Sequence, residues 1–135
     1  MWPTAFEAGT PNTPALFGLA AALDWLEQHH DLSRSIEQID RIRAALTARG
    51  DTTFFGPAGD APRLPILSFL LAGMHPIEVG ALLAEASIEV RSGFHCAPWI
   101  HRRLGTEADG TVRISVGPLV EDAAIEAACS ILTAL

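Results

Sequence analysis

The chain of 135 residues lacks lysine, since its 9 basic side chains are all arginines. This absence excludes functions that need a lysine amine within the chain, including a Schiff base to a carbonyl cofactor. Basic clusters are also scarce. The 16 acidic residues give a net charge of −7, and the only adjacent basic pair is Arg102-Arg103. Such a chain repels a phosphate backbone, so we expect no nucleic-acid partner.

Long apolar runs and cysteines are few. The longest uncharged stretches, 9–23 and 64–77, are interrupted by Pro, Asn or His and are shorter than the roughly 20 residues that span a bilayer. The N-terminus has no basic segment before an apolar run, as a signal peptide would. Only Cys96 and Cys129 are present, in a chain apolar enough to form a core without disulfides. We therefore expect no membrane helix and a cytoplasmic location.

Apolar residues at helical spacing predict four helices. The first covers about 14–29, with Thr13 as its capping residue, and the second is capped by Ser33 and ended by Gly50. His75-Pro76 opens the third, and residues 121–132 form the last. On the stripe of this last helix, Cys129 is expected as a small core residue.

Four segments have the composition or alternation of strands, at 52–55, 66–71, 88–91 and 111–116. The order ααββαββα predicts an α+β fold, a two-layer sandwich with helices on one face of a four-stranded sheet. We expect one domain over residues 1–135. The alternation directs Arg91 and Arg113 away from the core face. On neighbouring strands they could hold a carboxylate, or they could be two ordinary solvated arginines.

A loop of about 19 residues, 92–110, is expected to carry function because it is long for a compact domain. It holds Cys96 beside His95, His101 and arginines, a setting that favours the thiolate. Cys96 is therefore a candidate nucleophile or sulfur acceptor, with an inert loop cysteine as the alternative. The spacing of these residues does not match a metal site, so no metal is expected.

Residues 7–13 precede the first helix and contain a glycine, two hydroxyls and an amide. Such a turn can present N–H groups and a hydroxyl to a phosphate, although ordinary helix capping explains most of the pattern.

Three segments together resemble one family, the cysteine desulfurases dependent on pyridoxal phosphate (PLP), within the class V aminotransferase group. Residues 6–13, with 18–23, look like the entry to the family's C-terminal small domain. Val90-Arg91-Ser92-Gly93-Phe94-His95-Cys96-Ala97-Pro98 looks like its cysteine loop, and Gly110-Thr111-Val112-Arg113-Ile114-Ser115 like its substrate-arginine strand. The segments occur in the family's order and cover nearly the whole chain.

The resemblance implies that Cys96 attacks the sulfur of L-cysteine bound to PLP and becomes a persulfide, with release of alanine. Arg113, with Arg91 nearby, would hold the substrate carboxylate, next to His95. Thr10 would contact the cofactor phosphate of the neighbouring subunit of a homodimer. A sulfur-acceptor protein is a further implied partner.

The sequence departs from the family in three places. Phe94 stands where many members have a second histidine, and residues 118–120 replace an Asn-Thr pair. The large domain with the cofactor lysine has no counterpart, so we expect a C-terminal small domain that is inactive alone and binds no PLP covalently. Another class V enzyme, such as an aminotransferase or selenocysteine lyase, remains an alternative, as does a separate sulfur-carrier or interaction module.

Overall fold

The computed structural model describes residues 9–29, 31–57 and 61–135, which fall into two units, 1–30 and 31–135. The first unit contains α1 (Thr13–His29), one residue longer at its start than predicted. Asn12, and not the predicted Thr13, caps this helix, because its side-chain oxygen accepts from the Ala15 N–H at 3.2 Å. No residue of α1 is buried within the described structure.

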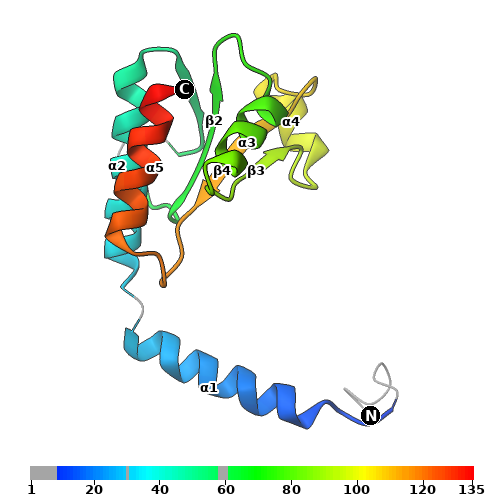
Figure 1. Ribbon diagram of the computed structural model, residues 1–135. Helices are drawn as coiled ribbons and strands as arrows, with labels where there is room; N and C mark the ends of the chain where they lie inside the picture. The colour runs from blue at the N-terminus through cyan, green and yellow to red at the C-terminus, as the bar shows by residue number, and fades with distance from the viewer. Residues whose placement is uncertain (1–8, 30, 58–60) are drawn as a thin grey trace. The chain divides into compact units, whose positions relative to one another are not determined.

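The second unit is an α+β sandwich, which confirms the predicted fold class (Figure 1). Its four strands are antiparallel in the order β1-β2-β4-β3. The elements in chain order are α2 (Leu32–Arg49), β1 (Thr52–Phe55), β2 (Ile66–Leu71), α3 (Pro76–Glu85), β3 (Arg91–Gly93), α4 (Pro98–Leu104), β4 (Thr111–Ser115) and α5 (Asp122–Ala134). None of the helices in the described residues has the length and apolar content to cross a bilayer.

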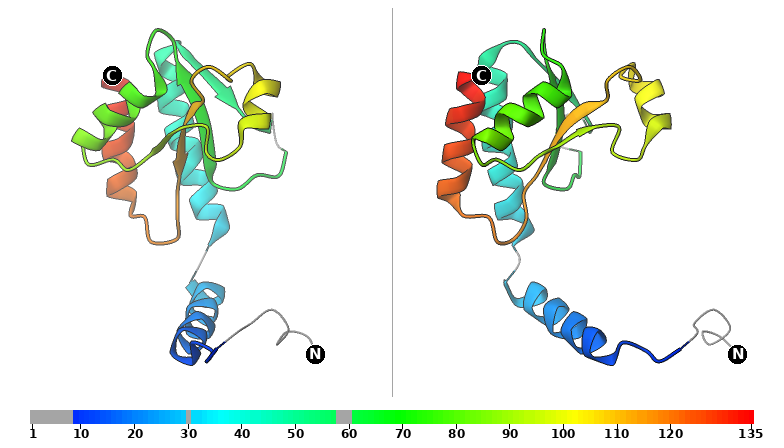
Figure 2. Two further views of the ribbon diagram at one scale, coloured as in Figure 1. Left: turned by 90° about the vertical axis from the view of Figure 1, so that its right-hand side faces the viewer. Right: turned by 45° about the vertical axis from the view of Figure 1, so that its right-hand side comes forward.

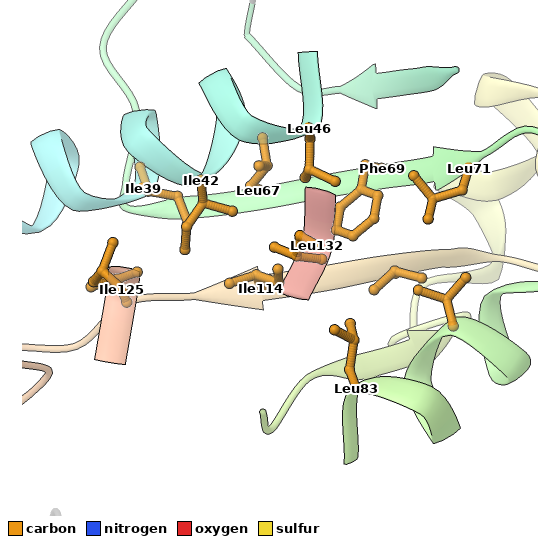
Figure 3. Packing of buried hydrophobic residues seen from close by; sticks show 13 residues of the cluster. Ile39, Ile42, Leu46, Leu67, Phe69, Leu71, Leu83, Ile114, Ile125 and Leu132 are labelled. Atoms are coloured by element: carbon orange, nitrogen blue, oxygen red, sulfur yellow. The ribbon is translucent and has the colours of Figure 1, made fainter. Parts of the chain in front are cut away.

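The core lies between the sheet and α2, α3 and α5 (Figure 3). Phe69 on β2 and Val112 on β4 are directly opposite each other and both are 0% exposed. The helices contribute Leu46, Leu83 and Leu132, also 0% exposed. Burying a side chain of this size stabilises the fold by about 1.5–3 kcal/mol. Cys129 packs against this cluster, as predicted, and burial raises the pKa of its thiol.

Polar contacts join α2 to α5. The Asp122 carboxylate accepts from Arg34, Gln38 and Arg41 at 3.0–3.2 Å, so three side chains of α2 meet one residue of α5. These contacts hold the pKa of Asp122 below its usual value.

The caps of α2 and α3 differ in how well the sequence predicted them. Asp31 caps α2, and the predicted Ser33 instead donates its backbone N–H to that carboxylate. An aspartate two residues earlier accepts from the N–H groups at the start of the helix, the role that the serine was expected to have. His75 caps α3 as predicted, since its Nδ1 accepts from the Ile77 N–H.

The predicted strand 88–91 was wrong in its span, because pairing with β4 begins only at Arg91. Ser87, at a positive φ of 60°, and the bond from the Ile88 N–H to Leu83 show that the chain is still leaving α3 before that point. Residues 88–92 nevertheless alternate in exposure as the pattern predicted. The alternation therefore gave the faces correctly and the strand ends incorrectly.

The predicted loop 92–110 contains the end of β3 and a helix, α4. Pro98 occupies the first turn of α4, and Gly105 ends it in a left-handed conformation with φ of 70°. Proline and glycine are loop signals, but the same residues start and stop helices. Figure 2 shows α4 across the sheet from α2 and α5.

Candidate active site

A row of polar side chains crosses the face of the sheet that α2, α3 and α5 leave uncovered. Ser68 on β2 is directly opposite Arg113 on β4, which is in turn directly opposite Arg91 on β3. Directly opposite residues of antiparallel strands project from the same face. The prediction that both arginines leave the core face is confirmed, and the structure shows that their strands are neighbours. We call this surface, defined by Ser68, Arg91, Thr111 and Arg113, the open face.

Arg113 is the half-buried member of the pair, and Arg91 is exposed. The Nε of Arg113 is buried without a hydrogen-bond partner. Neither arginine forms an ion pair with any residue that the structure describes. Because buried donors in proteins are nearly always paired, Arg113 has an unfilled capacity for an acceptor.

Two hollows meet at Arg113. One, of about 270 Å³, is lined by Ser68, His95, His101 and Thr111 together with apolar residues of β1 and α4. The other, of about 540 Å³, is lined by Arg91 and residues of α3 and the segment that follows it. A group bound in either hollow would lie next to the Arg113 guanidinium.

His95 faces the smaller hollow from the turn after β3. Its Nε2 lies 3.1 Å from the Thr111 hydroxyl, and its Nδ1 is buried without a partner. Burial lowers the pKa of His95, and the positive charge of Arg113 lowers it further. The neutral ring therefore offers a nitrogen that can accept or donate a proton beside Arg113.

Cys96 follows directly and is exposed as a free thiol. His95 and Cys96 have positive φ values of 51° and 59°. The Ala97 N–H donates to the Phe94 carbonyl at 2.9 Å and closes this four-residue turn. The turn thus presents the thiol at the surface while its neighbour His95 points into the hollow.

His101 is a residue of this site that the sequence did not single out, beyond its closeness to Cys96. It is 3% exposed, with Nδ1 at 2.8 Å from the Thr106 hydroxyl and Nε2 at 3.1 Å from the Phe94 carbonyl. The His95 and His101 ring centroids are 5.9 Å apart. Pro98 and Gly105, taken as helix limits, are the signal that could have placed His101 on a helix.

The structure does not place Thr10 at the open face. It lies exposed just before α1 in the first unit, whose placement relative to the second unit is not determined. Residues 1–8, which begin the segment resembling the family's entry to the small domain, lie outside the described residues. Among the residues described, no three His, Cys, Asp or Glu side chains are grouped to hold a metal ion.

The arrangement combines a nucleophile with an anion site. A surface thiol, a neutral imidazole and two guanidinium groups follow one another from the turn onto β4 and β3. Two planar guanidinium groups match the geometry of a carboxylate. A small molecule with a carboxylate at one end could therefore be held by Arg113 while its other end reaches toward the turn.

Comparison with known proteins gives the family context of this geometry. The family model described as Aminotransferase class-V matches residues 1–127. A probable cysteine desulfurase of Pseudomonas aeruginosa is 36% identical over 118 residues, 85% of this chain and 28% of that protein. A probable cysteine desulfurase 1 of Mycobacterium leprae is 39% identical over 116 residues, 84% of this chain and 18% of that protein. The chain thus spans about a quarter of the length of such curated relatives.

Solved structures agree with these sequence matches. The apo cysteine desulfurase of Thermococcus onnurineus superimposes with a TM-score of 0.87 at 32% identity, over 98% of this chain and 33% of that one. The cysteine desulfurase CsdA of Escherichia coli, in an S-sulfonic acid form, gives a TM-score of 0.81 at 33% identity, over 96% of this chain and 32% of that one. The fold described above therefore corresponds to about a third of each of these two enzymes.

Proposed function

Because the chain belongs to the class V aminotransferase family, we propose that residues 1–135 form the C-terminal small domain of a PLP-dependent cysteine desulfurase. The matched part makes up 28% of one of the desulfurases it resembles and 33% of another. The observation that carries the proposal is the exposed Cys96 thiol beside His95, whose ring lies 3.1 Å from the Thr111 hydroxyl on the same face as Arg113 and its unpartnered Nε.

The cofactor would be held mainly by residues outside this chain. The chain has no lysine for a Schiff base with PLP, and Thr10 would offer its hydroxyl to the cofactor phosphate. When bound, PLP supplies an electron sink that weakens bonds of the amino-acid substrate. The unpartnered Arg113 Nε and His95 Nδ1 fit an anionic substrate beside the cofactor.

The residues of this chain then divide the work on L-cysteine. Arg113, assisted by Arg91, holds the substrate carboxylate. The Cys96 thiolate attacks the substrate sulfur, so that an S–S bond forms as the substrate C–S bond breaks. The electron pair of the broken bond stays with the substrate carbon, which takes up a proton and leaves as alanine. Cys96 retains the sulfur as a persulfide, and the adjacent His95, whose Nδ1 has no partner, would move a proton.

Two further assignments belong to the same proposal. The full-length enzyme would be a homodimer in which Thr10 serves the cofactor of the neighbouring subunit, and a sulfur-acceptor protein would take the persulfide sulfur from Cys96. Because Cys96 is exposed, another protein can reach it from solvent. We place this chemistry in the cytoplasm.

The decisive experiment is a Cys96→Ser change in the full-length enzyme. We expect it to abolish sulfide release from L-cysteine while substrate binding persists, because only the nucleophile is altered. Cys129→Ser is the matched control and should retain activity, since Cys129 lies in the core packing of α5. Sulfide release by the Cys96→Ser enzyme at the parental rate would overturn the desulfurase assignment in favour of an aminotransferase or lyase.

A further inference from the structure

The turn that carries Cys96 has an unfavourable backbone. Its central residues, His95 and Cys96, both have positive φ, and the Ala97 N–H to Phe94 carbonyl bond closes it. This is the pattern of a type I′ turn, in which Asn and Gly are preferred. Side chains other than these adopt the left-handed conformation only at an energetic cost. Contacts from outside the turn must therefore hold it in place.

His101 supplies such a contact from α4. A carbonyl oxygen can only accept, so the 3.1 Å contact requires His101 Nε2 to donate to Phe94. The other ring nitrogen, Nδ1, lies 2.8 Å from the Thr106 hydroxyl, which can donate to it. The Phe94 carbonyl thus accepts twice, once from within the turn and once from His101. The ring of Phe94 also packs edge-on against His101, at 5.5 Å between centroids.

The backbone of His101 is fixed as firmly as its ring. Its carbonyl accepts from the N–H groups of Gly105 and Thr106, the two residues that follow α4. Its side chain is 3% exposed and is one wall of the smaller hollow. Helix α4 and the Cys96 turn are therefore joined at one buried residue.

We propose that His101 is a positioning residue that holds the Cys96 turn in its reactive conformation through the bond from Nε2 to the Phe94 carbonyl. The inference rests on the proposed function for the role of Cys96. His101 itself does not contact the substrate in this scheme. When His101 is replaced, the turn relaxes toward negative φ values, and the Cys96 thiol moves away from the substrate that Arg113 holds.

The first test measures the turn itself in the 135-residue chain, by hydrogen exchange of the Ala97 amide. We expect His101→Asn to accelerate this exchange roughly tenfold, because the shorter side chain cannot supply the Nε2 donor. Amides of β2 should exchange as in the unaltered chain, since the core is untouched. Unchanged exchange at Ala97, or equal acceleration in β2, would overturn the inference.

Two variants separate a lost hydrogen bond from general damage to α4. His101→Gln places an N–H donor near the position of Nε2 and should restore Ala97 protection. Arg102→Ala, on the same helix, leaves His101 intact and should have no effect, although it removes the stacking of Arg102 on Trp99. If His101→Gln exchanges as fast as His101→Asn, the Nε2 bond is not what holds the turn.

The second test uses persulfide formation at Cys96 in the full-length enzyme. We expect His101→Asn to lower kcat roughly tenfold or more, since small misplacement of a reacting group is costly, with KM for cysteine little changed because Arg113 is intact. His101→Gln should recover the rate. A normal rate in His101→Asn would refute the positioning role alone. Absence of persulfide in the unaltered enzyme would refute the proposed function.

Discussion

The two faces of the sheet differ in how completely their side chains are packed or hydrogen-bonded by the rest of this chain. On the helix-covered face, Phe69 and Val112 are 0% exposed and pack against three helices. On the open face, one position along β4 from Val112, Arg113 has a buried Nε without a partner, and beside it His95, in the turn after β3, has a buried Nδ1 without one. The first face stabilises the fold, and the second keeps hydrogen-bonding groups that no described residue pairs. Strand alternation is what allows both roles within a few residues.

The largest effect should follow from a change on the helix-covered face. Phe69→Ala removes a fully buried ring and should lower the free energy of unfolding by about 3–5 kcal/mol. Ser68→Ala, its neighbour on the open face, should change it by less than about 0.5 kcal/mol. Urea unfolding of the 135-residue chain measures both. Similar losses for the two variants would show that the faces are not energetically distinct.

A smaller loss of stability is expected from a change at Gly110, which lies next to Gly93 where β3 pairs with β4. Gly110 has a φ of 77°, and an added Cβ would lie 2.2 Å from the Gly93 backbone. Gly110→Ala should therefore cost roughly 2–4 kcal/mol, from strain and from the separation of β3 and β4. Gly105 also has a left-handed backbone, with φ of 70°, but an added Cβ there meets no atom within 4 Å. Gly105→Ala should therefore lower the free energy of unfolding by only about 1 kcal/mol. Equal unfolding free energies for the two variants would contradict the close approach.

On the open face itself, the effect should appear in binding and not in folding. Arg113→Lys in the full-length enzyme should weaken cysteine binding by about 1.5–3 kcal/mol, because an ammonium cannot replace the planar guanidinium. Arg91→Lys is the comparison, and its effect should be smaller because Arg91 is exposed. The measurement is KM for cysteine, with urea unfolding as a check that folding is retained. A larger effect at Arg91 would reverse the assignment of the principal carboxylate ligand.

These expectations also mark what the sequence alone could predict. Apolar periodicity was enough for the core helices and for β2, because packing dictates those residues. The alternation placed Arg91 and Arg113 on one face before any pairing was known. Strand ends were harder, since the start of β3 depends on where α3 releases the chain.

The sequence singled out the reactive residue types of the candidate site but not the residue that contacts them from α4. Cys96 and His95 stand out as residue types in a basic segment. The burial of His101 depends on α4, and Pro98 and Gly105 made that helix look like a loop in the sequence. Thr10 lies in the first unit, and neither composition nor spacing indicates what its hydroxyl contacts, so its role stays a prediction. Long-range placement of polar groups is a tertiary property.

The smallest effect concerns the protonation of His95, which lies beside the open face. The pKa of His95 is lowered, first by burial and then by Arg113, with smaller contributions from His101 and Arg91, although a bond with Thr111 opposes them. The unfolded chain therefore binds a proton at His95 more readily than the folded chain does, below the ordinary value of about 6.5. The stability that neutral His95 permits is present above that pH and is lost as the pH falls through it.

A His95→Gln variant isolates this contribution, because it keeps a donor toward Thr111 and does not titrate. The unaltered chain should lose more unfolding free energy than the variant between about pH 7.5 and about pH 5.5, measured by urea unfolding at each pH. Asp51 and Asp122 also have lowered pKa values, but their contributions are lost only at more acidic pH. His101 is present in both proteins and cancels in the difference. Identical pH dependence in the two proteins would mean that other contacts offset the effect of burial and of Arg113 on the pKa of His95. The unpartnered atoms beside the open face would then be better stabilised than their surroundings indicate.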